Sequence, residues 1–209
     1  MNATSIVLVI VAVYFSPSAS GVPMEAVRNT STTTQNGEKV LRIETIVPSS
    51  AEKVWSTLTT AEGWKTWAAP VVAVDFHIGG TISSHYDANA KIGSPGTIQL
   101  GIVNYLEKEM ITFKVKLTAQ FPEKARAEDQ NLQEIVQIIP IDSTHTQVIS
   151  SMVGWGTGKE WEEVYKFFAK GNQRSYQQLF NSLSGKKHGV GDHPSTDGRR
   201  AWLRLPTIR

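Results

Sequence analysis

Histidine and acidic side chains are considered first, because they bind metal ions and transfer protons. The five histidines of this 209-residue chain lie apart, in two neighbouring predicted strands, a predicted turn and the C-terminal segment: His77, His85, His145, His188 and His193. A metal site needs three or four ligands in a fixed geometry, and cysteine is absent. We therefore expect no metal and no cofactor, and the lack of cysteine excludes disulfides and a cysteine nucleophile.

Paired carboxylates and nucleophile motifs give no catalytic site. The acidic pairs fall in predicted turns or on the polar side of a predicted helix, which we interpret as solvated charge: Glu107/Glu109, Glu128/Asp129 and Glu162/Glu163. No serine lies in a G-x-S-x-G turn, and no glycine-rich phosphate-binding motif occurs. The sequence identifies no catalytic residue, so we expect a binding protein rather than an enzyme.

The stretch that organises the chain is a helical pattern from Gly158 to Leu183. Its apolar residues recur at spacings of three, four, seven and eight and form one stripe with a period of 3.6: Trp161, Val164, Tyr165, Phe168, Tyr176, Leu179, Phe180 and Leu183. A helix with so aromatic a stripe needs a partner surface, and a curved sheet is the simplest one. Gly171 interrupts the pattern, which indicates either a close packing contact or a point where the helix flexes.

The chain before this helix has mainly the alternating pattern of β-strands. Residues 38–47 alternate as a first strand, and two short helices follow, capped by Ser49 or Ser50 and by Thr60. Six further strands are expected over 71–76, 81–86, 97–106, 110–117, 132–139 and 146–152. The turns between them are short, so an antiparallel sheet is predicted.

The two ends of the chain differ from this domain in composition. Residues 1–20 contain a ten-residue apolar run followed by Ser18-Ala19-Ser20, which predicts a cleaved signal peptide and no stable membrane span afterwards. Residues 21–37 are polar and turn-prone, and we expect a disordered linker. Residues 184–209 hold six Lys and Arg against two Asp, and we expect a disordered basic tail. The core is nearly neutral, which argues against nucleic-acid binding.

Several local stretches resemble one known family. The order of one strand, two short helices, six strands and a long helix resembles the α+β helix-grip fold of the START/SRPBCC (Bet v 1-like) superfamily. Within it, four segments resemble the family of the activator of heat-shock-protein-90 ATPase homologue: Ile46–Trp55, Leu58–Pro70, Ile78-Gly79-Gly80, and Gly154-Trp155-Gly156 followed by Glu160-Trp161, Tyr165 and Phe168. The resemblance covers residues 38–183, and Met152 stands where relatives often carry histidine.

This resemblance implies a seven-stranded antiparallel sheet wrapped around the C-terminal helix, with a cavity between them. Inward strand faces and the helix stripe then supply the walls of a site for a small hydrophobic or amphipathic ligand, with a few hydroxyls for hydrogen bonds. The residues expected there are Trp64, Trp67, Phe76, Ile82, Ser84, Tyr86, Phe113, Val148, Ser150, Met152, Trp161, Tyr165 and Phe168.

Three functions stay open at this point. The first is an exported, secreted or periplasmic, binder of a hydrophobic ligand; without cleavage the chain would be membrane-anchored or cytoplasmic. The second is an enzyme of the polyketide-cyclase or hydrolase kind, acting through Tyr86, Ser84 or Ser150. The third is a protein-interaction module like the chaperone-ATPase activator, which needs a protein partner in the cytosol.

Overall fold

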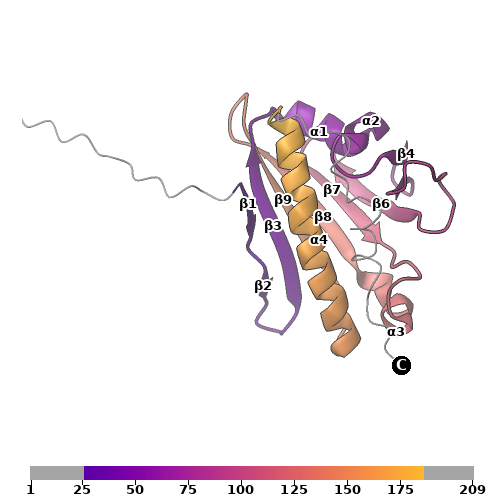
Figure 1. Ribbon diagram of the computed structural model, residues 1–209. Helices are drawn as coiled ribbons and strands as arrows, with labels where there is room; N and C mark the ends of the chain where they lie inside the picture. Colours follow the sequence, from indigo (N-terminus) through magenta and orange to yellow (C-terminus); the bar gives the residue numbers. More distant parts are fainter. Residues whose placement is uncertain (1–25, 186–209) are drawn as a thin grey trace, which may run out of the picture.

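A computed structural model describes residues 26–185, and Figure 1 shows one long helix lying across one face of a sheet. The strands are β1 (Val27–Asn29), β2 (Thr32–Thr33), β3 (Lys39–Val47), β4 (Val71–Asp75), β5 (Thr81–His85), β6 (Ile98–Leu106), β7 (Met110–Val115), β8 (Gln133–Pro140) and β9 (Thr146–Val153). The helices are α1 (Ala51–Thr59), α2 (Ala61–Lys65), α3 (Glu123–Ala127), the 3-10 turn η1 (Asp129–Asn131) and α4 (Lys159–Leu183).

The strands form one antiparallel sheet in the order β1-β3-β9-β8-β7-β6-β5-β4, and β2 also pairs with β3. The first predicted strand pairs with the last, β3 with β9, in a seven-residue register from Leu41 opposite Met152 to Val47 opposite Thr146. The seven predicted strands are present, and the α+β helix-grip prediction is confirmed.

The prediction of a disordered linker is wrong for the part of residues 21–37 that the structure describes. Residues 27–29 and 32–33 add two short strands to the edge of β3. Val27 is fully buried, and the Thr45 hydroxyl donates to the Ala26 carbonyl at 2.6 Å. The polar composition of this segment conceals the pairing, because an edge strand obtains its hydrogen bonds from the neighbouring backbone.

The two short helices begin where the sequence predicts. The Ser50 hydroxyl accepts from the Lys53 amide at the start of α1, and the Thr60 hydroxyl accepts from the Gly63 amide at the start of α2. A Cβ atom on Gly63 would lie 2.5 Å from the Thr57 carbonyl oxygen. Glycine therefore allows α2 to pack directly against α1.

The segment before β8 was predicted as a turn, and it contains α3 and η1. Asp129 is 3% exposed and accepts hydrogen bonds from the Lys116 ammonium at 2.8 Å and the Leu117 amide at 2.9 Å. Glu128 accepts from the Trp161 indole N–H at 2.9 Å. The interpretation of these two carboxylates as solvated charge is therefore wrong, since both fix this segment to its neighbours.

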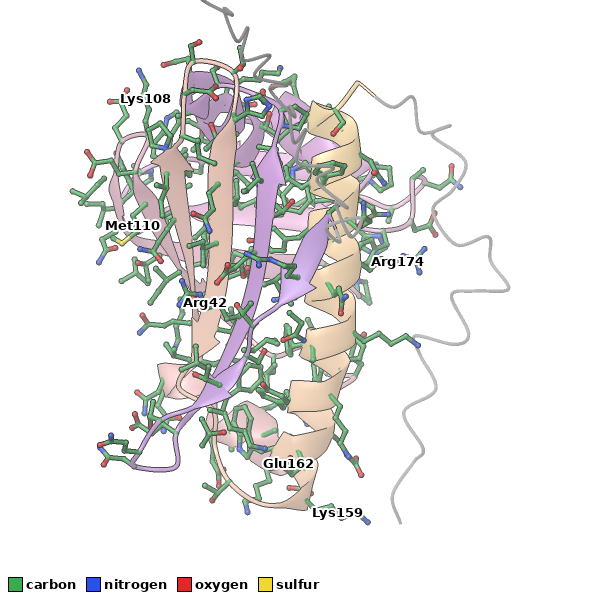
Figure 2. All side chains as sticks on the ribbon, turned by 90° about the vertical axis from the view of Figure 1, so that its left-hand side faces the viewer. Arg42, Lys108, Met110, Lys159, Glu162 and Arg174 are labelled. Carbon is green, nitrogen blue, oxygen red and sulfur yellow. The ribbon has the colours of Figure 1, made fainter. Side chains whose placement is uncertain are left out.

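Helix α4 packs its predicted stripe against the sheet. Trp161, Val164, Tyr176 and Leu179 are fully buried. A side chain on Gly156 would overlap the Trp161 indole, so this glycine makes room for the first aromatic residue of the stripe. In Figure 2, Lys159 and Glu162 lie at the start of α4, and Arg174 projects further along on the side away from β3 and β9.

Three sequence predictions lie wholly or mainly outside the described residues. These are the signal peptide over 1–20, the first residues of the linker, 21–25, and the basic tail apart from Ser184 and Gly185. Among residues 26–185, no helix has the length and apolar character needed to cross a membrane.

Candidate functional site

The inward face of β9 carries three of the predicted site residues. Val148, Ser150 and Met152 alternate along the strand and are at most 1% exposed. The strand register sets Ser150 opposite Ile43 of β3 and Val136 of β8. The middle of the sheet therefore offers a mainly apolar surface with one hydroxyl.

Glu134 on β8 joins this surface. The register places it between Phe113 of β7 and Met152 of β9. Its Oε1 accepts from the Ser150 hydroxyl at 2.6 Å and from the Tyr176 hydroxyl of α4 at 3.0 Å. A carboxyl group thus lies between the sheet and the helix, joined to both by neutral hydroxyl donors.

The surroundings of Glu134 raise the pKa of its carboxyl group. Burial raises the pKa of the Glu134 carboxyl above its ordinary value, and the hydrogen bonds from Ser150 and Tyr176 lower it by smaller amounts. Burial also raises the pKa of the Tyr176 phenol well above its ordinary value, with the nearby Glu134 carboxylate acting in the same direction. The Glu134 side chain is nevertheless only half-buried, so solvent reaches part of it.

The middle of α4 presents polar, half-buried side chains on the side that faces the sheet. Asn172 and Ser175 lie between the stripe residues Phe168 and Tyr176. Phe168, Asn172 and Ser175 are half-buried, whereas Val164 and Tyr176 on either side are fully buried. The Asn172 amide donates to the Met152 sulfur at 3.1 Å. Polar side chains therefore occupy the helix where it crosses Glu134 and Met152.

Three predicted aromatic residues form a buried group beside Tyr176. Trp64 packs edge-on against Phe113, and Trp67 lies 5.0 Å from Trp64 and 6.2 Å from Tyr176 between ring centroids. The Trp64 indole donates to the Leu58 carbonyl. The buried Trp67 indole N–H has no acceptor among the described residues.

The aromatic residues at the start of α4 form a second group. Tyr165 lies 4.9 Å and Phe168 5.9 Å from the Trp155 ring, and Phe168 also stacks on Phe121 at 5.6 Å. Trp161 is buried against Trp155. These rings pack together at the start of α4, and their contact with a ligand stays a prediction.

The remaining predicted residues lie on β4 and β5 or directly after them. Phe76 packs against Trp55 and Tyr105, and Ile82 and Ser84 are buried. Tyr86 differs, because its side chain is 58% exposed. Neighbouring protein atoms raise the pKa of its phenol, and the Arg174 guanidinium lowers it by a smaller amount.

The sequence of this domain matches one known family. Residues 48–184, more than half of the chain, match the family described as activator of Hsp90 ATPase homolog 1-like protein (AHSA1). The chain belongs to this family. A comparison with curated proteins found no match.

Solved structures similar to this AHSA1-family chain share its fold at low sequence identity. The Aha1 dimer from Colwellia psychrerythraea is 15% identical, with a TM-score of 0.56, over 71% of this chain and 98% of that one. EF2215 from Enterococcus faecalis is 11% identical, with a TM-score of 0.56, over 83% and 88%. CalU16 from Micromonospora echinospora is 14% identical, with a TM-score of 0.54, over 87% and 98%.

An open recess of about 250 Å³ lies on the flank of this AHSA1-family domain. It is lined by Ser31, Thr32, Thr33, Lys39 and Tyr165. The Lys39 ammonium forms an ion pair with Glu162 and lies 4.9 Å from the centre of the Tyr165 ring. Sequence reasoning missed this recess because two of its residues form β2, which was not predicted.

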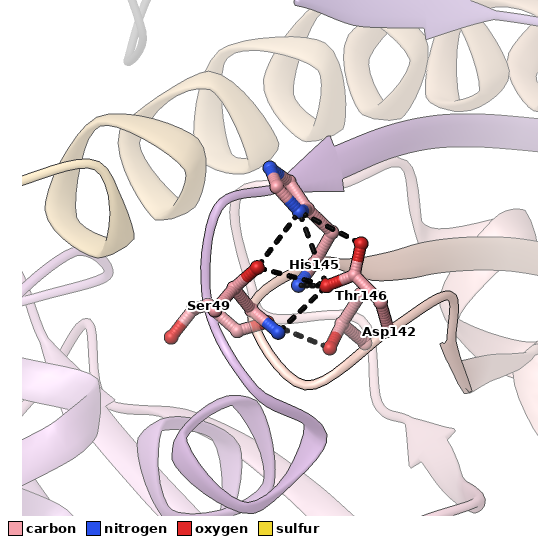
Figure 3. A network of polar contacts seen from close by, with 5 residues as sticks. Ser49, Asp142, His145 and Thr146 are labelled. Atoms are coloured by element: carbon pink, nitrogen blue, oxygen red, sulfur yellow. Dashed lines mark hydrogen bonds and ion pairs between the residues drawn. The ribbon is translucent and has the colours of Figure 1, made fainter.

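The hairpin between β8 and β9 brings an acid, a histidine and a serine together, as Figure 3 shows. Asp142 accepts from the amides of Thr144 and His145, and the former bond is the main reason why the pKa of Asp142 falls to about 2. Ser49 takes part through its backbone carbonyl, which accepts from the Thr146 hydroxyl at 2.8 Å. The network fastens the turn to the start of α1 and presents no activated serine.

Among residues 26–185 no cluster of His, Asp and Glu suits a metal ion.

Proposed function

We propose that this AHSA1-family protein is exported and binds a small hydrophobic or amphipathic ligand between the sheet and α4. The observation that carries the proposal is the uneven burial of the α4 stripe. Trp161 and Leu179 near its ends are fully buried, whereas Phe168 and Asn172 between them are half-buried. A helix that served only to close the core would carry apolar residues along its whole inward side, and Asn172 departs from that pattern.

The residues facing this part of α4 have the composition of a small-molecule site. Val148 and Met152 supply apolar surface, and Ser150 and Glu134 supply polar atoms at the centre of the sheet. Ligand sites are mostly apolar, with few polar groups that fix the orientation of the ligand. This composition favours a ligand with a large apolar part and one polar group.

Native mass spectrometry of the purified full chain and displacement of a fluorescent amphiphile test the proposal together. We expect a co-purified or added ligand at one per chain, with displacement by unlabelled competitor. Asn172→Phe places a bulky ring where α4 faces Met152 and is expected to abolish binding, while Lys170→Phe, on an exposed position of the same helix, leaves binding intact. Failure of the wild-type chain to bind in both assays contradicts the proposal.

Export rests on the first twenty residues. The apolar run from Ile6 to Phe15 and the small residues Ser18 and Ser20 fit a signal peptidase site. Mass spectrometry of the protein recovered from its native host is expected to give a mature chain that begins at Gly21. A chain that retains Met1 contradicts export.

Two alternatives have specific support. The family description favours a chaperone-activating module, which requires a cytosolic product, so the same N-terminal measurement separates it from an exported binder. Glu134 supplies the inward acid that an enzyme needs, whereas the exposure of Tyr86 weakens the catalytic role expected for that residue. Turnover of a bound ligand that stops in Glu134→Gln would favour the enzyme.

A further inference from the structure

Glu134 is an acidic side chain between two layers of the fold that forms no ion pair with any described residue. Both of its hydrogen bonds reach Oε1, from Ser150 and Tyr176. No group within residues 26–185 donates to Oε2. Because the side chain is half-buried, we interpret Oε2 as the oxygen that remains accessible.

A purely structural role does not require an acid at this position. Glutamine has the same length, and its carbonyl oxygen would accept the hydroxyls of Ser150 and Tyr176 equally well. It would also avoid the cost of placing a charge inside the protein without a partner. The property that distinguishes Glu134 from glutamine is its negative charge, which points to a positively charged partner.

Aromatic residues lie next to this acid. Phe113 is its register neighbour on β7, Tyr176 contacts it from α4, and the Trp67 ring centre lies 6.2 Å from that of Tyr176. An ammonium group binds a carboxylate through charge-assisted hydrogen bonds and is attracted to aromatic faces. A carboxylate among aromatic rings is therefore complementary to a protonated amine.

We propose that Glu134 is the polar anchor of the ligand site and that the ligand is an amphiphile with a protonated amine head. This inference rests on the proposed function, because it assumes that a ligand enters between the sheet and α4. The ammonium group binds Oε2 while Ser150 and Tyr176 hold Oε1. The apolar part of the ligand packs against inward residues of the sheet such as Val148. A fatty acid is disfavoured, since its carboxylate would meet a like charge.

The test compares three probes that share one chain and differ in the head group: octylamine, octanol and octanoate. Each is titrated into the full chain at pH 7 while tryptophan fluorescence is followed. We expect octylamine to bind about tenfold more tightly than octanol, which is the low end of the effect of a hydrogen bond to a charged group. Octanoate is expected to bind most weakly.

Three variants locate the effect. Glu134→Gln is expected to remove the preference for octylamine and to leave octanol affinity within about twofold, because only the charge changes. Glu107→Gln removes an exposed carboxylate from the β6–β7 turn and should leave all three affinities unchanged. Ser150→Ala removes one hydrogen bond to Glu134 but keeps the charge, so it should retain the octylamine preference. The unchanged octanol affinity of Glu134→Gln shows that this variant is folded.

The outcomes separate this inference from the proposed function. Binding of the probes without an amine preference, or a preference that survives in Glu134→Gln, overturns the anchor and leaves ligand binding standing. Tighter binding of octanoate than of octylamine also overturns it. Absence of binding by all three probes overturns the proposed function and this inference with it.

Discussion

Replacing Gly171 with alanine tests whether α4 packs closely against another segment at this position. Gly171 lies in the interior of a 25-residue helix, and a Cβ atom built on it meets no atom within 4 Å. Glycine in a helix interior is about 1 kcal/mol less favourable than alanine. The open space means that alanine gains this helix propensity without a steric cost. We therefore expect Gly171→Ala to raise the free energy of unfolding by about 0.8–1 kcal/mol and the Tm by about 2–4 °C.

Urea unfolding followed by circular dichroism measures this difference. Gly63→Ala is the matched control, because its Cβ would lie 2.5 Å from the Thr57 carbonyl oxygen; overpacking of this kind destabilises by about 1–3 kcal/mol. A loss of stability in Gly171→Ala would refute the reasoning, since it would mean that the glycine packs closely against another segment. Stopped-flow uptake of octylamine by the same variant tests the flexing role, which predicts slower uptake.

Three further predictions concern ionisable groups. Burial raises the pKa of Glu134, so the contribution of its carboxyl to stability is complete below the ordinary pKa of 4.5 and is lost as the pH rises through the folded-state pKa. In urea unfolding, Glu134→Gln should therefore be more stable than the wild type above the folded-state pKa. A gain that is the same at every pH contradicts the reasoning. NMR titration of Asp142 should give a midpoint of about 2, and an ordinary midpoint would show that the turn amides do not hold it. Asp129→Ala should cost about 1–3 kcal/mol in urea unfolding, because the buried Leu117 amide loses its acceptor; an unchanged stability contradicts that role.

Much of the fold can be predicted because its elements carry local signals. β7 alternates cleanly, with Ile111 and Phe113 buried, and the α4 stripe repeats at helical spacing. Ser50 and Thr60 mark helix starts through hydrogen bonds that span only three residues. These signals depend on near neighbours in the chain, so the sequence alone contains them.

The missed features depend on partners that are distant in the chain. Glu134 alternates with the inward Val136 and Ile138, but Ile135 and Ile139 make the opposite face of β8 apolar as well. The strand pattern therefore does not say which side of β8 is inward. The contact with Tyr176 from α4 resolves it, and that contact spans 42 positions.

Asp129 and the edge strands β1 and β2 were missed for the same reason. The stabilising partners of Asp129 are Lys116 and the Leu117 amide, which lie 13 and 12 positions away in the sequence. The strands β1 and β2 are polar and short, and only their pairing with β3 defines them. Tyr86 follows directly on β5, and its inward alternation ends there, so it is exposed.

The central claim is that a small amphiphile binds between the sheet and α4, and methionine methyl NMR tests it most directly. Met152 is buried on the inward face of β9 and contacts Asn172 of α4, whereas Met110 precedes the inward Ile111 of β7 and lies on the opposite face of the sheet. Addition of octylamine to the ¹³C-methyl-methionine-labelled full chain is expected to shift the Met152 signal and to leave that of Met110 in place. A Met152 signal that does not move at saturating probe, or a shift confined to Met110, would contradict the claim.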